Sequence, residues 1–515
     1  MYVITLLLTF GLQSRLNYHF TLPLHILVIE TTKIDILIDK KQNIPGKKMA
    51  PLLQLLTTTT INMIFTIVII IISIIFTIYI FTRPHHHDKN YTSNNNNKYN
   101  FNNDNEEESD DDALPAYIID DDDDDDDTNN IKTTILITGG TGVLGWRVAA
   151  MCKERFPSDS TEITIFDINV PKPHRKLKHV TYIQGDITSE IDTICAFATT
   201  FTHPKPCKNI VFHVAGLLPA VSTTSEKLHQ VNTIGSKQIV ELCKNYCIDL
   251  LLATSSASVV LPNDNLYVDG LNGQVLPYPS DDNYVDTYAR SKAKGEQYVL
   301  NANGANHQTS DDDVLNTKLA TVSLRPSIIY GADDSKFGER LLRNEINYIF
   351  DKGNNIIDFG WADNIALGHV QCCEHILNHS TNNKYYNNHA AGKAFHLGQG
   401  IGLTTFEFYN LKEWKNGKPS SIPISLMKLI AKFNYYCYQF IGIAPIDPFL
   451  RPDSFNFMAG RHWWFKCENA KNMFGYNPIS VEDSILIMQN KQMKEWNIRG
   501  KVSQEELHLY VSTNI

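Results

Sequence analysis

The sequence lacks the cysteine spacing of a disulfide-rich or zinc-binding protein. Its nine cysteines are scattered over 515 residues, and the only adjacent pair is Cys372–Cys373. The pattern matches neither a disulfide framework nor a Cys-x-x-Cys zinc motif. We therefore expect both residues of the pair to be core residues of an apolar helix.

The chain also lacks an excess of positive charge. It has 46 lysine and arginine residues against 56 aspartate and glutamate residues, a formal net charge of −10, which argues against nucleic acid as a partner. Much of the negative charge lies in the runs Glu106–Asp112 and Asp120–Asp127. Such runs repel themselves and stay extended, so together with the asparagine-rich Asn94–Asn97 they predict a disordered linker over residues 83–130.

The sequence does not carry a clear metal-binding motif. An acidic run could bind calcium, but neither run contains a spaced Asp-x-Asp-x-Asp-Gly loop. The histidines His85–His87 lie in a low-complexity segment, where composition alone explains them. We therefore expect no metal site.

One hydrophobic run, Ile61–Thr82, contains no charged residue. As a helix rising ~1.5 Å per residue it would extend ~33 Å, so we expect a transmembrane helix here. Residues 1–60 form an uncertain N-terminal segment, since translation from Met49 would make this helix an ordinary signal anchor. The lysines before it favour a lumenal catalytic domain under the positive-inside rule, and a start at Met49 removes that excess.

A glycine-rich stretch follows the linker. Ile135–Gly145 places an apolar strand, a glycine turn and a helix start in succession, which is typical of a dinucleotide cradle. We expect cofactor contacts from its glycines and first helical residues, namely Gly139, Gly142, Val143, Leu144 and Gly145. A second strand-like run ends at Asp167, where a carboxylate can accept hydrogen bonds from ribose hydroxyls and repel a 2′-phosphate. The sequence therefore favours NAD over NADP.

Three side chains further along the chain make a candidate redox site. Ser256 follows an apolar strand-like run, and Tyr288 and Lys292 are spaced so that they share one face of a helix. The ammonium would lower the pKa of the phenol and make it a usable general base. Ser256 would hydrogen-bond the substrate oxygen.

With these motifs the chain resembles the extended short-chain dehydrogenases/reductases. Further matches are Gly185-Asp186-Ile187, His213–Gly216, Val231–Gly235 and Leu324–Gly331. The resemblance implies that Asp186 and Ile187 lie beside the adenine and that Asn232 supports the catalytic water and lysine. It also implies that the strand with Pro326 lines the nicotinamide.

Within that superfamily the chain resembles the 3β-hydroxysteroid dehydrogenase family, which includes sterol-4α-carboxylate 3-dehydrogenases. The resemblance covers about residues 132–490 and is carried by Leu276–Pro279, Asp363–His369, Gly392–Gly398 and Phe465–Tyr476. The acidic residues Asp311–Asp313 depart from the family pattern, and we expect them in a surface loop.

The resemblance implies NAD-dependent oxidation of the 3β-hydroxyl of a membrane-dissolved sterol or steroid. On a 4α-carboxysterol, the resulting 3-ketone would support decarboxylation. Two alternatives stay open: a dehydrogenase or epimerase acting on a polar ketone or nucleotide-sugar, and a membrane-tethered NAD-binding protein without turnover. The expected partners are the hydrophobic substrate and a membrane, and a homodimer is also open. We expect the endoplasmic reticulum membrane, with the catalytic domain facing the cytosol.

The predicted fold class is α/β. We expect a Rossmann-type doubly wound parallel sheet with a smaller C-terminal substrate-binding part, preceded by the transmembrane helix and linker. The NAD-binding domain is placed at 131–330 and the substrate-binding region at 331–515. Expected elements are strands at Asp249–Thr254 and Ala320–Leu324 and helices at Glu226–Lys244 and Asp286–Leu300.

The apolar and aromatic stretch Ile422–Phe440 is interrupted by Lys428 and Lys432. It fits an interfacial helix whose lysines reach lipid headgroups. It fits equally well a lid over the substrate pocket. In the first case the side chains expected to enter the lipid are Leu426, Met427, Leu429, Ile430 and Phe433.

Overall fold

The computed structural model describes most of residues 132–498. The described ranges are 117–118, 132–203, 207–264, 268–271, 276–308, 317–332, 348–380, 384–411, 420–444 and 461–498, with residues 338, 340, 446–447 and 449–453. None of the helices in these ranges is both long and apolar enough to cross a membrane. The predicted transmembrane helix at 61–82, the histidines at 85–87 and the acidic residues at 311–313 lie outside the described residues.

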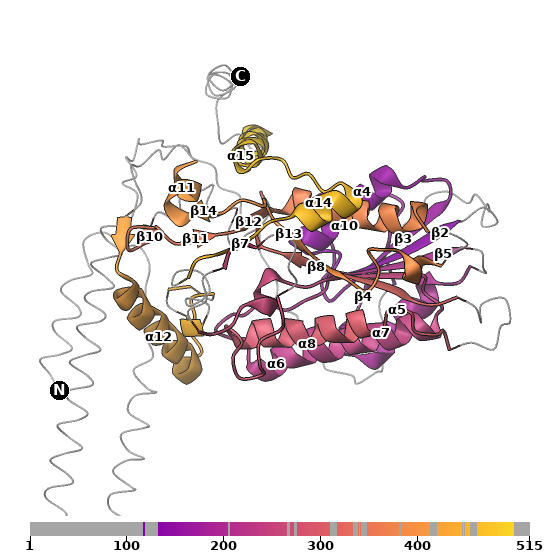
Figure 1. Cartoon of the computed structure of the whole chain (residues 1–515), viewed down its shortest axis with the longest axis horizontal. Helices are drawn as coiled ribbons and strands as arrows, with labels where there is room; N and C mark the ends of the chain where they lie inside the picture. The colour runs from indigo at the N-terminus through magenta and orange to yellow at the C-terminus, as the bar shows by residue number, and fades with distance from the viewer. Residues whose placement is uncertain are drawn as a thin grey trace, which may run out of the picture. The chain divides into compact units, whose positions relative to one another are not determined.

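Seven parallel strands form the main sheet of the described residues, in the order β4-β3-β2-β5-β6-β8-β13 (Figure 1). They are β2 (Thr133–Thr138), β3 (Thr161–Asp167), β4 (Thr181–Gln184), β5 (Lys208–His213), β6 (Leu250–Thr254), β8 (Ala320–Pro326) and β13 (Ala394–Leu397). The order reverses between β2 and β5, and ligands of such sheets bind at the carboxyl ends of the strands beside that point. The predicted doubly wound parallel sheet is confirmed.

A short strand, β1 (Tyr117–Ile118), pairs antiparallel with β4 at the edge of this sheet. These two residues belong to the segment 83–130, for which we expected disorder throughout. Seven uncharged residues, Ala113–Ile119, separate the two acidic runs, and two of them pair with the edge of β4. The rest of the segment lies outside the described residues.

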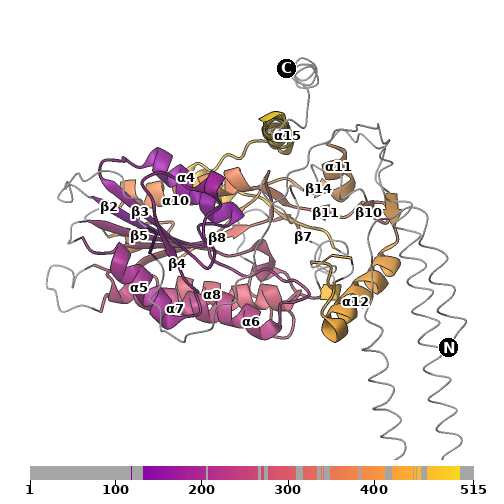
Figure 2. The same ribbon diagram turned by 180° about the vertical axis from the view of Figure 1, so that it is seen from behind.

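Helices cover both faces of the sheet. In both ribbon views α4 (Val143–Arg155) and α10 (Ala362–Asn378) lie on one face, and α5 (Glu190–Thr200), α7 (Ser236–Asn245) and α8 (Thr287–Asn301) lie on the other (Figures 1 and 2). Successive side chains of β2 alternate between the two cores: Ile135 and Ile137 pack on the α4 side, and Leu136 packs on the α5 side. Cys372 and Cys373 are buried in α10, as expected from the sequence.

The C-terminal part contains smaller sheets around a second apolar core. A four-stranded sheet has the order β14-β11-β16-β7, and two further pairs are β12 with β9 and β10 with β15. Their bounds are β7 (Val268–Leu271), β9 (Ile328–Tyr330), β10 (Tyr348–Phe350), β11 (Ile356–Ile357), β12 (Phe359–Trp361), β14 (Leu403–Thr404), β15 (Ser420–Ile422) and β16 (Trp463–Phe465). In the core, the rings of Phe359 and Phe408 stack with centroids 3.7 Å apart.

The predicted division at residue 330 does not coincide with the sheets. Strand β13 comes from beyond that residue yet pairs with β8 in the main sheet, while β7 comes from before it yet pairs with β16. Sequence order cannot reveal such an exchange, because each strand is short and its partner is distant in the chain. Each of the two predicted parts therefore contributes one strand to a sheet of the other part.

The remaining elements of the described residues are helices and helical turns, and one of them, η3, is irregular. They are η2 (Pro173–Arg175), α6 (Ser225–His229), η3 (Gln230–Gly235), η4 (Ala257–Val260), η5 (Tyr385–Asn387), α11 (Thr405–Asn410), α12 (Ile424–Ile441), α14 (Glu468–Phe474) and α15 (Val481–Ile498). The helix predicted over 226–244 is helical throughout, but η3 is a π-helical turn inside it. Such wide turns often occur at functional sites.

Candidate active site

The glycine turn after β2 is packed so closely that side chains cannot replace two of its glycines. Gly139 has φ +69°, and a Cβ atom there would lie 2.7 Å from the backbone nitrogen of Ala215. A Cβ atom on Gly145 would overlap the carbonyl oxygen of Gly139. The turn therefore depends on glycine for its shape, as a dinucleotide cradle does.

Helix α4 begins directly after this turn with free donors. Its N-cap is Gly142, which offers no side chain to the helix end. The first-turn N–H groups of Val143, Leu144 and Gly145 point along the axis at the positive end of the helix dipole. The residues that the sequence singled out for a pyrophosphate thus fit an anion at this place.

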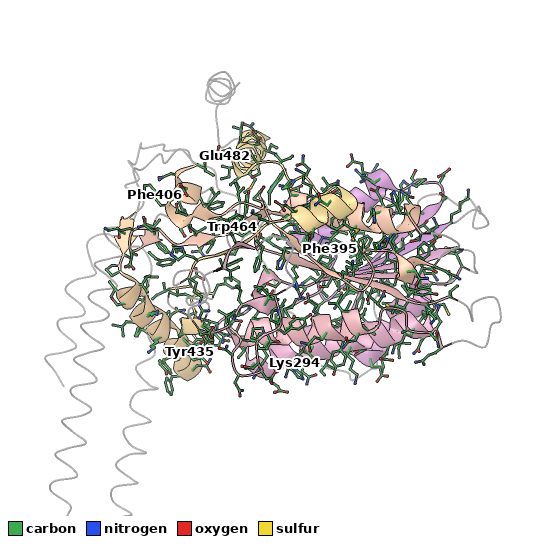
Figure 3. The ribbon with its side chains drawn as sticks, viewed as in Figure 1. Lys294, Phe395, Phe406, Tyr435, Trp464 and Glu482 are labelled. Atoms are coloured by element: carbon green, nitrogen blue, oxygen red, sulfur yellow. The ribbon has the colours of Figure 1, made fainter. Side chains whose placement is uncertain are left out.

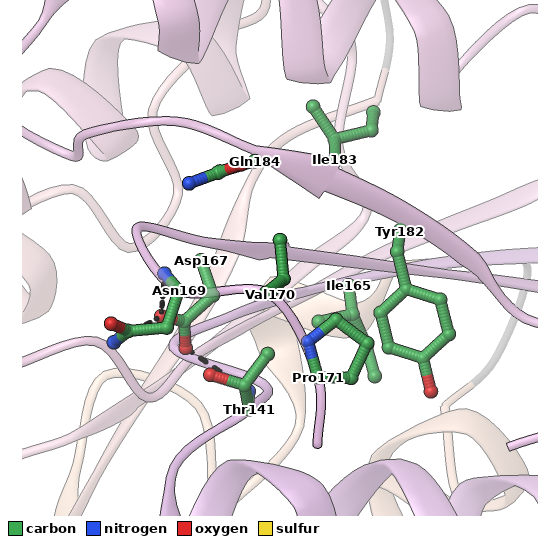
Figure 4. Close-up of a pocket in the computed structure, with 9 residues that line it drawn as sticks. All are labelled: Thr141, Ile165, Asp167, Asn169, Val170, Pro171, Tyr182, Ile183 and Gln184. Atoms are coloured by element: carbon green, nitrogen blue, oxygen red, sulfur yellow. Dashed lines mark hydrogen bonds between the residues drawn. The ribbon is translucent and has the colours of Figure 1, made fainter. Parts of the chain in front are cut away.

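Asp167 ends β3 next to the glycine turn. Its Oδ2 accepts a hydrogen bond from the N–H of Thr141 at 3.0 Å, and its Oδ1 accepts one from the N–H of Asn169 at 2.9 Å (Figure 4). Both residues line a small pocket with Asp167, together with Val170 and Gln184. The carboxylate is thus fixed beside the glycine turn, and its contact with the adenosine ribose stays a prediction.

Asp186 and Ile187 follow β4 at the same edge of the sheet. Asp186 Oδ1 accepts hydrogen bonds from the N–H and the hydroxyl of Thr188, at 2.8 and 2.9 Å. Ile187 is buried, and a Cβ atom on Gly235 would lie 3.4 Å from it. The fold brings both residues to the cofactor edge, while their contact with the adenine remains a prediction.

Ser256 and Tyr288 lie together at the carboxyl end of β6. Ser256 caps η4, and its Oγ accepts a hydrogen bond from the N–H of Ser258. Burial raises the pKa of the Tyr288 phenol, and a hydrogen bond with Ser256 acts in the opposite direction. The predicted serine–tyrosine pair is therefore formed by residues from two different elements, η4 and α8.

Lys292 is on α8 with Tyr288, and its ammonium is buried. Its Nζ donates a hydrogen bond to the carbonyl oxygen of Thr254 at 2.6 Å. Burial lowers the pKa of Lys292 to about 8, and Glu296 raises it. We expected Lys292 to lower the pKa of Tyr288. Instead that pKa is raised, because desolvation of the phenol outweighs the neighbouring groups in this state.

A glycine of a neighbouring loop lies close to the Lys292 ammonium. A Cβ atom on Gly216 would lie 3.2 Å from its Nζ and 3.5 Å from Asn232 Oδ1, so the backbone at Gly216 lies close to both groups. Gly216 belongs to the loop that follows β5, next to the point where the strand order reverses.

Asn232 lies in the π-helical turn η3 and connects three segments. Its Nδ2 donates to the carbonyl oxygen of Leu217 and to Ser291 Oγ, each at 3.0 Å, and its Oδ1 accepts from the N–H of Leu217 at 2.8 Å. Ser291 Oγ in turn donates to the carbonyl oxygen of Tyr288. Asn232 thus fixes the loop after β5 against the helix that carries Tyr288 and Lys292.

Sequence reasoning missed a buried ion pair behind this site. Glu296, one turn after Lys292 on α8, accepts hydrogen bonds from Arg325 on β8, from the hydroxyl of Tyr278 and from Ser323. Although burial raises the pKa of Glu296, Arg325 lowers it further, so the carboxylate is ionised. The i, i+4 spacing of Lys292 and Glu296 predicts only that these two residues share a face of α8, and no local signal points to Arg325.

The C-terminal motifs are tied to the same edge of the sheet. Arg147 of α4 donates to Asp363 at 2.9 Å, and His369 hydrogen-bonds Thr254 Oγ1 at 2.8 Å. Pro326, predicted to line the nicotinamide, ends β8 opposite Leu397 of β13. The motif at 363–369 therefore holds α10 against α4 and against β6, whose residue Thr254 also accepts the hydrogen bond from Lys292.

Comparison with curated proteins finds several relatives with nearly equal sequence identity to this chain. The chain is 28% identical over 359 residues to short-chain dehydrogenase/reductase family 42E member 1 of Xenopus laevis, covering 67% of this chain and 85% of the relative. It is 27% identical over 364 residues to the decarboxylating sterol-4-alpha-carboxylate 3-dehydrogenase of Mus musculus, covering 68% and 88%. It is 28% identical over 362 residues to the 2-alkyl-3-oxoalkanoate reductase of Stenotrophomonas maltophilia, covering 68% and 97%.

Among solved structures, the crystal structure of gox2253 matches with a TM-score of 0.50 at 17% identity, covering 72% of this chain and 99% of that one. This likeness concerns the fold alone. Residues 136–421 match the 3-beta hydroxysteroid dehydrogenase/isomerase family, which is more than half of the chain. The protein is therefore an oxidoreductase that belongs to the 3-beta hydroxysteroid dehydrogenase/isomerase family and uses NAD as its cofactor.

Proposed function

We propose that this protein oxidises the 3β-hydroxyl of a sterol or steroid. The observation that carries the proposal is the hydrogen-bonded pair of Ser256 and Tyr288, beside the buried Lys292, at the sheet edge that also holds the glycine turn. A pure NAD-binding protein does not require a phenol and an ammonium at this place. The arrangement suits the removal of a proton from an alcohol.

Each residue has a distinct role in this proposal. Ser256 holds the substrate oxygen against the phenol, and Tyr288 accepts the hydroxyl proton. Bound NAD supplies the acceptor for the hydride that leaves the carbinol carbon. Lys292, held by Thr254, presents positive charge to the phenolate and the nicotinamide ribose, and Asn232 keeps the loop of Leu217 against α8.

The sterol assignment is supported by the sterol-4-alpha-carboxylate 3-dehydrogenase among the relatives. On a 4α-carboxysterol the new 3-ketone would stabilise the carbanion left by loss of carbon dioxide, without another protein group. The oxoalkanoate reductase is equally similar and acts on a non-sterol ketone, so it supplies the competing substrate class. A nucleotide-sugar epimerase and a non-catalytic NAD-binding protein are the remaining alternatives.

The test uses the full chain purified in detergent. It is incubated with NAD and, separately, with 3β-hydroxysterols with and without a 4α-carboxylate, 3-hydroxyalkanoates and UDP-sugars, while NADH formation is followed. We expect NADH with a 3β-hydroxysterol, and release of carbon dioxide only with the 4α-carboxylate. Turnover with hydroxyalkanoates or UDP-sugars alone would overturn the sterol assignment, and absence of turnover with all of them would leave a non-catalytic binder.

We also propose that the chain is attached to the endoplasmic reticulum membrane through Ile61–Thr82, with the catalytic part facing the cytosol. The uncharged run of this segment supports attachment, and the use of NAD supports the cytosolic side. A sterol substrate dissolved in the bilayer would make such attachment useful. The homodimer remains a prediction as well.

A further inference from the structure

Helix α12 (Ile424–Ile441) packs on the protein through one face only. Met427, Ile430, Ala431 and Asn434 are buried along that face. Asn434 holds the following segment, because its Nδ2 donates to the carbonyl oxygens of Asp447 and Leu450 at 2.7 and 3.0 Å. Both ribbon views place α12 beside the C-terminal sheets and away from the helices that cover the main sheet (Figures 1 and 2).

Two of the side chains that the sequence suggested would face lipid are instead packed against the protein. Met427 and Ile430, which we expected to enter lipid, are 4% and 8% exposed and contribute to the protein interior. Leu426 and Phe433 are half-buried, and Leu429 is exposed as expected. The helix is apolar on nearly every side, so the sequence alone could not separate its packed face from its free face.

The opposite side of α12 exposes large apolar side chains. Leu429, Tyr436 and Phe440 are 51%, 55% and 83% exposed, and Ile443, just past the helix end, is 57% exposed. The spacing of seven and four residues puts Leu429, Tyr436 and Phe440 on one side of the helix, and Ile443 follows the Gly442 cap directly. We call these four residues the outer α12 face.

The charges that α12 itself carries have one sign. Lys428 and Lys432 are exposed beside it, and α12 contains no aspartate or glutamate. Lysines with long apolar stems can keep their ammonium groups at headgroup level while neighbouring side chains enter lipid. Aromatic residues such as Tyr436 and Phe440 suit the same boundary.

Helix α12 is also bound to the loop that leads from β5 to the active site. Gln439 Nε2 donates to the carbonyl oxygen of Val221, and Arg451 Nη1 donates to the carbonyl oxygens of Ala220 and Thr223. The Arg451 guanidinium lies 5.9 Å from the ring centroid of Tyr435, a residue of α12 that is labelled in Figure 3. The same loop begins at Leu217, which Asn232 holds.

We propose that the outer α12 face docks on the surface of a bilayer that contains anionic lipid. The four apolar side chains enter the interface, and Lys428 and Lys432 contact the negative headgroups. The positive charge of Lys428 and Lys432 favours an anionic lipid surface over a second copy of this chain, since two copies meeting through this face would bring like charges together. Docking would place the loop at 217–223 next to the bilayer.

The test reads the α12 contact separately from any other membrane attachment. The full chain carrying Ile443→Cys is labelled with an environment-sensitive dye and mixed with phosphatidylcholine vesicles, with or without phosphatidylserine. The matched control is Ile191→Cys on α5, which is 69% exposed and distant from α12. The unmutated chain labelled in the same way gives the background from Cys195, Cys247 and Cys437.

We expect a blue shift of the dye at 443, and quenching by nitroxide on the lipid tails, only with phosphatidylserine vesicles. The dye at 191 should show neither. Lys428→Glu with Lys432→Glu should abolish the shift at 443 while NAD binding is kept. Equal spectra at 443 and 191 in vesicles would overturn the proposal. So would a shift at 443 that needs no lipid and grows with protein concentration, which would assign the face to a second copy.

Discussion

Arg325 Nη2 lies 2.5 Å from Glu296 Oε1, and both side chains are almost fully buried. The hydroxyls of Tyr278 and Ser323 each donate to Glu296 at 2.6 Å, so the carboxylate is fully engaged. The pair joins the helix that carries Tyr288 and Lys292 to the strand that ends at Pro326. It therefore fixes the catalytic helix relative to the strand predicted to line the nicotinamide.

The first prediction concerns the pH dependence set by Lys292. Burial lowers its pKa to about 8 and Glu296 raises it, so removal of the Glu296 charge lowers the pKa further. If the lysine must be protonated, activity is lost as pH rises through that pKa. Glu296→Gln should therefore move the alkaline limb of the kcat/KM profile to lower pH.

The control for this prediction is Glu241→Gln, a surface carboxylate paired with Lys244, which should leave the limb in place. Glu296→Gln should also cost about 3–5 kcal/mol of folding free energy, because Arg325 loses its buried partner. Thermal unfolding measures that loss. If the alkaline limb of the kcat/KM profile stays in place in folded Glu296→Gln protein, then Glu296 does not set the pKa of Lys292.

The second prediction is that Tyr288→Phe keeps NAD binding but loses about 10²–10⁴ in turnover. The ring still fills its place, whereas the proton acceptor is gone. NAD binding is measured by titration and turnover by NADH formation. Tyr298→Phe alters an exposed tyrosine of the same helix and should keep normal activity. Near-normal activity of Tyr288→Phe would exclude the phenol from proton transfer.

A third prediction assigns cofactor choice to Asp167. Asp167→Ala removes the carboxylate at the end of β3, so NAD affinity should fall about tenfold or more and NADP binding should improve. Asp159→Ala, at an exposed position before β3, should bind both cofactors as the unmutated chain does. Titration of each protein with both cofactors measures the ratio. A wild-type preference for NADP would contradict the assignment.

The fourth prediction is that attachment and chemistry can be separated. A chain beginning at Ile131 lacks the hydrophobic run 61–82 and also β1, but it keeps all seven parallel strands. It should fold, bind NAD and oxidise detergent-solubilised substrate at a rate near that of the full chain. It should leave the carbonate-resistant membrane fraction. Loss of NAD binding would show that the N-terminal part belongs to the fold.

The motifs near β2 could be predicted from sequence because their signals are local. A strand, a glycine turn and a helix start are adjacent in the chain, and Asp167 ends the next strand. The Glu296–Arg325 pair was not predictable in the same way, since its partners meet only when α8 packs on β8. The raised pKa of Tyr288 depends on burial, which residue spacing does not reveal.

The periodic spacing of apolar residues also predicts a helix without revealing its local irregularities. It predicted the helical segment at 226–244, but the wider hydrogen-bonding of η3, which places Asn232 against Ser291, leaves no mark in the apolar pattern. The strands exchanged across residue 330 are short, and their pairing depends on contacts between distant segments.

The exchange of strands across residue 330 governs the order of folding during synthesis. Ser256 and Tyr288 leave the ribosome before β13 and β16, so β8 waits with one edge unpaired and β7 waits without its partner strand. A nascent chain that ends between Pro326 and Ala394 contains every residue of the candidate catalytic set on an unfinished sheet. An open edge of this kind invites pairing with other chains, which makes this interval of translation the one in which chaperone protection matters most.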